Sequence, residues 1–232
     1  MPQNKNISSQ SGNIFMIILI GVLLFAALLY TFSRSLQTGT SNISAQQAEI
    51  AAQEMLNYAR MLDNAVSRVR QYGCSENEIS FENDEQPSRY NNLNAPSDNS
   101  CHIFDQNGGG VEWQDLQYGE IFIDDGNCIT DVGRGTSCTS ADAELLLYVI
   151  DIDAPICLEI NNRVNNIDKN IIPSSVDFDI TLIDDGFEGA FNSGTPTSIT
   201  GETIDTFATG CGQDSSGTTS GQYVFYHTLI AR

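Results

Sequence analysis

One uncharged apolar stretch near the amino terminus constrains this chain more than any other feature. Residues 14–32 read IFMIILIGVLLFAALLYTF and contain no charged side chain. As an α-helix, such a stretch extends roughly 28 Å, which is enough to cross the hydrocarbon core of a bilayer. We therefore expect a transmembrane helix over residues 14–32 that holds the chain at a membrane, with residues 1–13 as a cytoplasmic leader.

Three interpretations of this stretch stay open. A cleaved secretory signal needs a short apolar core and small residues at the cut, for which residues 31–33 would serve. A permanent single-span anchor needs no further feature. A prepilin-type leader is a short polar segment that ends in Gly before an uninterrupted apolar helix, and Gly12 followed by Asn13 fits that layout.

The rest of the chain is polar and strongly acidic, which excludes two classes of partner. It carries 30 Asp and Glu against 10 Lys and Arg, a formal net charge of −20. No basic stripe is present to neutralise phosphates, so we expect no nucleic acid as a partner. The same lack of basic residues argues against binding to anionic lipid headgroups.

Six cysteines follow the apolar stretch, and none of them forms a CxxC pair. This spacing argues against a zinc–thiolate site and against a thioredoxin-type redox motif. An even number of well-spread cysteines on an exported domain is typical of up to three disulfides, for which fifteen connectivities exist. The pairing of neighbours in sequence gives Cys74–Cys101, Cys128–Cys138 and Cys157–Cys211.

Two features agree on the orientation of the chain. Lys5 precedes the apolar stretch, whereas Arg34 is followed by a strongly acidic region that holds all the cysteines. Basic residues favour the cytoplasmic side of a membrane, and disulfides form in oxidising compartments. We therefore expect the amino terminus inside the cell and residues 43–232 outside, as an extracytoplasmic domain.

A linker and a second helix are expected after the apolar stretch. Gly39 lies in a polar run and lowers helix stability by about 1 kcal/mol, so residues 33–42 are predicted to be a linker. From residue 43 to residue 72, apolar side chains recur at steps of four and three, which predicts an amphipathic helix. Its seam consists of Ala48, Ala52, Met55, Ala59, Leu62, Val66 and Val69. Two uses of the seam stay open: packing on the sheet of its own domain, or bundling with other subunits.

The remainder, residues 74–232, is predicted to be rich in β-strand. A near-continuous apolar run at 145–152 indicates a central strand, and the alternation at 176–182 indicates a half-buried one. Further strands are expected at 79–81, 101–104, 111–113, 120–123 and 223–230, with a short helix at 156–164 and mostly loop over 184–221. The sum is an α+β fold, in which a long helix lies on a mostly antiparallel, disulfide-stabilised sheet.

No catalytic or cofactor motif appears in the sequence. The GxSxG, HExxH, Walker and dinucleotide patterns are all missing. The two histidines, His102 and His227, lie in strand-like runs beside aromatic residues and are interpreted as structural. We expect no catalytic residue, no resident cofactor and no enzyme activity.

Acid-rich turns are the one ligand-like feature. Three of them stand out, at Asp105-Gln106-Asn107, at residues 124–127 and at residues 184–188. Their carboxylate and amide oxygens are ligands that calcium prefers, although none of the turns completes the EF-hand spacing. Asp, Asn and Gly are also the usual residues of tight turns. A calcium site and a plain turn therefore both stay open at these positions.

The order of these features resembles that of bacterial type IV pilins and type II secretion pseudopilins. The resemblance rests on a short leader that ends at Gly12, an apolar helix, an amphipathic helix to Tyr72 and a cysteine-bearing sheet domain. It implies cleavage of the leader between Gly12 and Asn13. The family usually has Phe or Met directly after the cleaved Gly and Glu at the fifth mature position, where this chain has Asn13 and Ile17. Minor, tip-type members can lack that Glu.

The resemblance implies a structural role at the bacterial inner membrane. In this family the apolar half-helix anchors the subunit in the membrane before assembly and then packs in the filament core. The implied function is a pilin-like or minor-pseudopilin-like subunit of a filament or of a secretion or adhesion assembly, with copies of itself or other pilin-like subunits as partners. The alternative is a single-span membrane-anchored binding module whose outer domain contacts an unknown ligand.

Mass spectrometry under non-reducing conditions tests the disulfide prediction. We expect six oxidised cysteines joined as the three sequence-near pairs, because the cysteine-bearing region is predicted to face an oxidising compartment. Detection of six free thiols in protein purified from the native host would contradict the export of this region.

Overall fold

The computed structural model describes residues 13–87, 89–133, 138–171, 173, 175–178, 186–191, 194–201, 204, 206–217 and 219–232. Within the first helix it describes side chains at residues 18–24 and 45–71. The chain divides into two compact units, Met1–Gln47 and Ala48–Arg232. Each unit is described by itself below.

The first helix, α1, runs from Asn13 to Gln71. Its backbone stays helical through residues 33–42, so the linker predicted there is not found. A single glycine such as Gly39 lowers helix stability by only about 1 kcal/mol, which the hydrogen bonds of a continuing helix outweigh. The helix ends where the sequence predicted, because Gly73 has φ +105°, a left-handed conformation in which glycine is favoured.

The membrane span predicted for residues 14–32 lies in the first unit. Among the residues that the structure describes, no helix is long and apolar enough to cross a membrane. The side chains of residues 14–17 and 25–32 lie outside the described part of α1. The transmembrane helix therefore stays a prediction.

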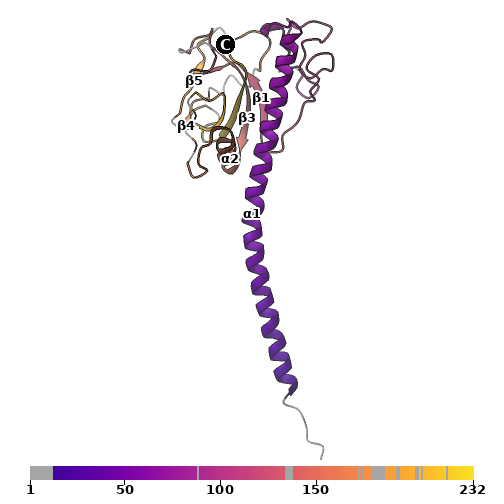
Figure 1. The fold of residues 1–232 in the computed structure, drawn as a ribbon, viewed down its shortest axis with the longest axis vertical. Helices are drawn as coiled ribbons and strands as arrows, with labels where there is room; N and C mark the ends of the chain where they lie inside the picture. Colours follow the sequence, from indigo (N-terminus) through magenta and orange to yellow (C-terminus); the bar gives the residue numbers. More distant parts are fainter. Residues whose placement is uncertain are drawn as a thin grey trace, which may run out of the picture. The chain divides into compact units, whose positions relative to one another are not determined.

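The second unit is an α+β domain built on two sheets (Figure 1). The larger sheet has the order β1-β3-β7-β6-β4 and is antiparallel except for the parallel pair β4 and β6. Its strands are β1 (Glu120–Asp124), β3 (Leu145–Ile152), β4 (Ser175–Val176), β6 (Thr209–Asp214) and β7 (Tyr223–Ile230). A small parallel sheet pairs β2 (Asn127–Ile129) with β5 (Thr197–Ile199). The predicted α+β fold with a mostly antiparallel, disulfide-bearing sheet is confirmed in this unit, and the sheet is mixed because β4 and β6 are parallel.

Strand β3 lies between β1 and β7 and is buried on both faces, as its continuous apolar run predicted. Because side chains alternate along a strand, Leu145, Leu147 and Val149 face one core. Leu146 and Tyr148 face a second core on the opposite side of the sheet. The domain therefore has two hydrophobic cores that share one sheet.

The carboxyl-terminal part of α1 covers one face of the larger sheet. All seven seam residues named above are at most 6% exposed and belong to the same core as the inward side chains of β1 and β3. Figure 1 shows this part of α1 beside β1 and β3. The seam is thus used for packing within its own domain, and it is not available for bundling with other subunits.

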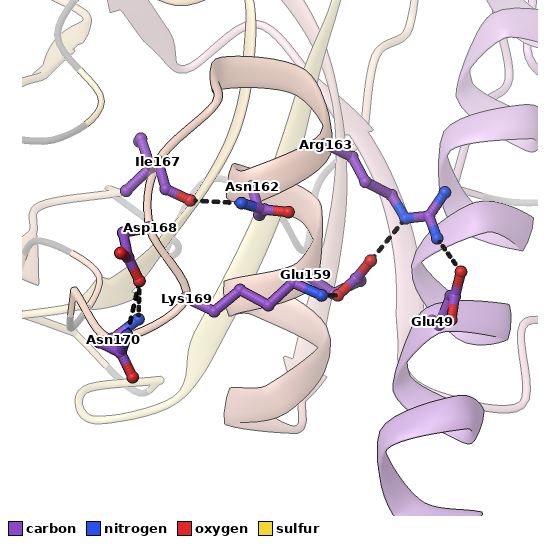
Figure 2. A network of polar contacts seen from close by, with 8 residues as sticks. All are labelled: Glu49, Glu159, Asn162, Arg163, Ile167, Asp168, Lys169 and Asn170. Carbon is purple, nitrogen blue, oxygen red and sulfur yellow. Dashed lines mark hydrogen bonds and ion pairs between the residues drawn. The ribbon is translucent and has the colours of Figure 1, made fainter. Parts of the chain in front are cut away.

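The second helix, α2 (Ala154–Asn165), has Pro155 in its first turn, where proline is tolerated because its missing N–H is not needed. A polar network joins α2 to α1 (Figure 2). Glu159 is buried on α2 and pairs with Arg163 at 2.7 Å and with Lys169. Arg163 also pairs with Glu49 of α1, with 2.7 Å between Nη2 and Oε1. One guanidinium therefore links the two helices.

Strand β6 lies within residues 184–221, which were expected to be mostly loop because they are rich in Gly, Ser and Thr. Its neighbours explain the strand. An added Cβ at Gly210 would lie 2.8 Å from the Tyr226 hydroxyl, so a larger residue there would force the buried Tyr226 side chain of β7 to shift. Asn161 of α2 is buried and forms two hydrogen bonds of 2.8 Å with the backbone N–H and C=O of Cys211.

Other strand predictions differ from the structure. Residues 79–81 and 101–104 meet only in an isolated bridge between Ser80 and His102. Residues 111–113 form no strand, and their apolar side chains pack on the α1 core from a loop. Of the strand predicted at 176–182, Val176 ends β4, and residues 179–182 lie outside the described part.

Three disulfides join Cys74 to Cys101, Cys128 to Cys138 and Cys157 to Cys211. These are the three sequence-near pairs that were predicted. Cys74 follows the end of α1, so its bond ties the segment around Cys101 to that helix. Cys157 of α2 is bonded to β6, which adds a covalent link to the Asn161 hydrogen bonds.

A matched pair of α1 substitutions tests the packing of the seam. Leu62 is fully buried, so we expect Leu62→Ala to lower the free energy of unfolding by about 2–5 kcal/mol. The adjacent Met61 is 41% exposed, and Met61→Ala should change that free energy by less than about 0.5 kcal/mol. Urea unfolding of both variants measures the difference, and equal losses would show that α1 is not packed through this seam.

Candidate functional site

A run of exposed apolar side chains marks the first unit. Six large apolar residues of α1 are between 48% and 64% exposed: Ile18, Leu19, Ile20, Val22, Leu23 and Leu24. They occupy consecutive helical positions apart from Gly21, so they point in all directions around the helix axis. We call residues 18–24 the apolar segment. A helix that is apolar all round is stable only when lipid or protein covers it.

The predicted cleavage point lies at the edge of the described chain. Gly12 is outside the described residues, and Asn13 is the first residue of α1. Leader cleavage between these two residues therefore stays a prediction.

The two histidines occupy different settings. His227 lies on β7, and its Nδ1 is 2.6 Å from the Thr209 hydroxyl of β6. Burial lowers the pKa of the His227 imidazole. His102 lies in the bridge with Ser80 and lines a cavity that is described below. The structure therefore does not bring the two histidines into one site.

The acid-rich turns make hydrogen bonds within the domain. Asp105 accepts from the Asn107 backbone N–H at 2.8 Å and from the Asn99 amide at 3.0 Å, which holds the pKa of its carboxyl below the usual value. Asp124 accepts from the Gly126 N–H, and the Asn127 amide oxygen accepts from the Tyr148 hydroxyl at 2.6 Å.

The third predicted turn is described only in part, because residues 184 and 185 lie outside the described part of the chain. Among the described residues, no group of three or more His, Cys, Asp or Glu side chains is placed to hold a metal ion. The two described turns fit the ordinary structural use of Asp and Asn in turns.

Glu144 is a buried acid that the sequence did not single out. It is 1% exposed, and its carboxylate accepts a 2.8 Å hydrogen bond from the Ile129 N–H of β2. Burial raises the pKa of Glu144 from 4.5 to about 7. Its own N–H donates to the carbonyl of Asn127, also on β2. Glu144 therefore holds β2 of the small sheet in place, and ionisation of its buried carboxyl lowers the free energy of unfolding.

Two cavities adjoin the only tryptophan, Trp113, whose ring forms part of the wall of both. We call them the first and second Trp113 cavities. The first has a volume of about 740 Å³ and the second of about 480 Å³. The carboxylates of the first cavity are Asp115, Glu120, Asp151 and Asp153. Those of the second are Glu82, Asp84, Glu85, Asp105 and Glu112.

Contacts with α1 position the loop that carries Trp113. Arg68 of α1 donates a 2.9 Å hydrogen bond to the Gly109 carbonyl, and the Gln114 N–H donates to the Tyr58 hydroxyl at 3.4 Å. The Trp113 indole N–H donates to Asp115 at 3.2 Å. The first two bonds fix the backbone before and after Trp113, and the third fixes its indole ring. The core of the domain thus determines where the tryptophan lies.

Sequence reasoning did not identify these cavities. Their walls come from segments far apart in the chain, at residues 82–87, 99–105, 112–121, 150–153 and 219–222. The one available signal was the single tryptophan with Glu112 before it and Asp115 after it. The left-handed Asp151 (φ 59°), beside a register shift in the pairing of β3, was another feature that a sequence does not reveal.

Comparison with protein-family models, curated proteins and solved structures found no match for this chain. The functional argument below therefore rests on the residues themselves.

The raised pKa of Glu144 predicts how stability changes with pH. The native state holds a proton on Glu144 that the unfolded chain has released, so the free energy of unfolding falls as pH rises from 4.5 to about 7. We expect this fall to be about 2–3 kcal/mol larger in the wild type than in Glu144→Gln, which does not ionise. The exposed Glu54→Gln is the matched control and should keep the wild-type dependence. Parallel pH profiles of wild type and Glu144→Gln in urea unfolding would contradict this role.

Proposed function

We propose that this chain is a membrane-anchored, pilin-like or minor-pseudopilin-like structural subunit of the bacterial inner membrane, which contributes to a filament or to a secretion or adhesion assembly. The observation that carries the proposal is the exposure of six large apolar side chains in the apolar segment, within a stretch that has no charge. Everything after that stretch is acidic and carries three disulfides.

The energetics of the apolar segment support this proposal. Burial of apolar surface is worth about 25 cal/mol per Å², so a large aliphatic side chain gains about 1.5–3 kcal/mol when it leaves water. Six such residues side by side on one helix make exposure to water strongly unfavourable. Lipid chains can cover the segment before assembly, and the same segments of neighbouring subunits can cover it afterwards.

The structure of the second unit favours a subunit that folds before it assembles. The α1 seam is already buried in its own domain, so the domain needs no partner to complete this core. The disulfides and the acidic surface suit the outer side of a membrane. Ile17 at the fifth mature position, in place of Glu, favours a minor or tip-type subunit over the main repeating subunit.

Contacts with other subunits would then use surfaces other than the seam. Ile50 and Met61 of α1 are 53% and 41% exposed, and they are eleven residues apart, which places them on nearly the same face of the helix. This face carries Asn57 and Asn64 between the apolar positions. A mixed face of this kind fits contacts that form and separate during assembly better than it fits a permanent core.

Amino-terminal sequencing of the protein purified from membranes tests the proposal. We expect a mature chain that begins at Asn13, and we expect Gly12→Val to leave the leader uncleaved. Gly21→Ala is the matched control, since an added Cβ there meets no atom within 4 Å, and it should be processed normally. An intact Met1 in the wild type, or a cut near Ser33, would contradict the pilin-like assignment.

A further inference from the structure

We propose that the second Trp113 cavity binds a lysine- or arginine-bearing segment of a partner protein, with the cationic side chains against Trp113 and the surrounding carboxylates. This inference does not depend on how the chain is anchored or whether it assembles. It gives the second unit a binding function that no motif in the sequence indicates.

The charge of the cavity is the first argument. Five carboxylates line it, and in the described part of the chain no lysine or arginine lies in its wall. The six ion pairs found among the described residues involve none of these five acids. Asp84, Glu85 and Glu112 are also exposed to solvent, so a cation can reach them. Like charges gathered in a concave site create a negative potential that attracts a cationic partner.

The aromatic wall is an independent second argument. Trp113 is partly buried, and its ring packs edge-on against Phe104, with 5.3 Å between centroids. The Tyr90 ring is tilted against it, with 6.2 Å between centroids. The face of an indole attracts guanidinium and ammonium groups by a cation–π interaction, and tryptophan is the strongest of the aromatic side chains in this respect. A ring that is already held in place loses little entropy when it binds.

The size and the charge of the site identify the occupant. A volume of about 480 Å³ lies within the range of pockets that hold organic ligands and is much larger than a single ion. Trp113 also lines the first cavity, so the two cavities adjoin at this residue. A second copy of this chain is a poor occupant, because each copy carries a net charge of −20. A basic segment of a different protein satisfies both the charge and the volume.

The first cavity contributes less to the attraction. Its Glu120 already lies 3.5 Å from Arg89, and Arg89 also donates to Gln86 at the cavity wall. One of its carboxylates is therefore partly neutralised by the chain itself. The test is accordingly directed at the acids of the second cavity.

The experiment uses the full chain in uncharged detergent micelles and a fluorescein-labelled octa-arginine peptide as the probe. Binding is followed by fluorescence anisotropy of the peptide and, with unlabelled peptide, by the emission of Trp113, which is the only tryptophan and lines both Trp113 cavities. We expect saturable binding, a change in Trp113 emission over the same concentrations, and weaker binding as salt increases.

A matched pair of double variants separates the site from the general charge of the protein. Asp84→Asn with Glu85→Gln removes two charges from the second cavity and should weaken binding about tenfold. Glu54→Gln with Asp168→Asn removes two charges from exposed positions outside both cavities and should change the affinity by less than about twofold. All four residues are exposed, so the variants should remain folded.

Three outcomes would overturn the proposal. Equal weakening by both double variants would show that the peptide responds only to net charge. Binding without a change in Trp113 emission would place the peptide elsewhere on the chain. Saturable binding of calcium or spermine with the same sensitivity to Asp84→Asn and Glu85→Gln, together with no binding of octa-arginine, would identify a small-cation site instead.

Discussion

Close packing of one helix face on one sheet is the constraint on which the rest of this domain depends. Five of the seven seam residues of α1 are alanine or valine on the face that meets β1 and β3, and small side chains let the helix backbone approach the sheet. The wide core that results includes large residues such as Phe81 and Phe225. Because α1 is fixed in this way, the loops that cross it acquire defined positions, including the loop of Trp113.

A second attachment fixes β6, the strand next to the β4 edge of the sheet. Strand β6 is glycine-rich and would be poorly defined alone, but α2 holds it through Asn161 and the bond between Cys157 and Cys211. The ion pairs of Glu159 and Arg163 then connect α2 to Glu49 at the start of the packed part of α1. Buried charges require such partners, since an unpaired carboxylate inside a protein is strongly destabilising. The two linked helices thus share one hydrophobic core on the same face of the sheet.

The two proposed functions use different parts of the chain for different physical reasons. The proposed role of the apolar segment rests on the hydrophobic effect, since exposure of its six aliphatic side chains to water is unfavourable. The second Trp113 cavity is defined by charge and by an ordered aromatic ring. An anchored subunit that also captures a basic segment would bring its partner to the membrane surface. Neither function requires a change in the core of the second unit.

Sequence alone determined the features that depend on local periodicity. The α1 seam, its end at Gly73, the central strand β3 and the last strand β7 all follow from the spacing of apolar residues, and sequence-near cysteines gave the three disulfide pairs. Tertiary structure decided the rest. Strand β6 pairs with β7 and is bonded to α2, and the Trp113 cavities form where distant loops meet. Such features depend on contacts between residues far apart in the chain, which no local pattern records.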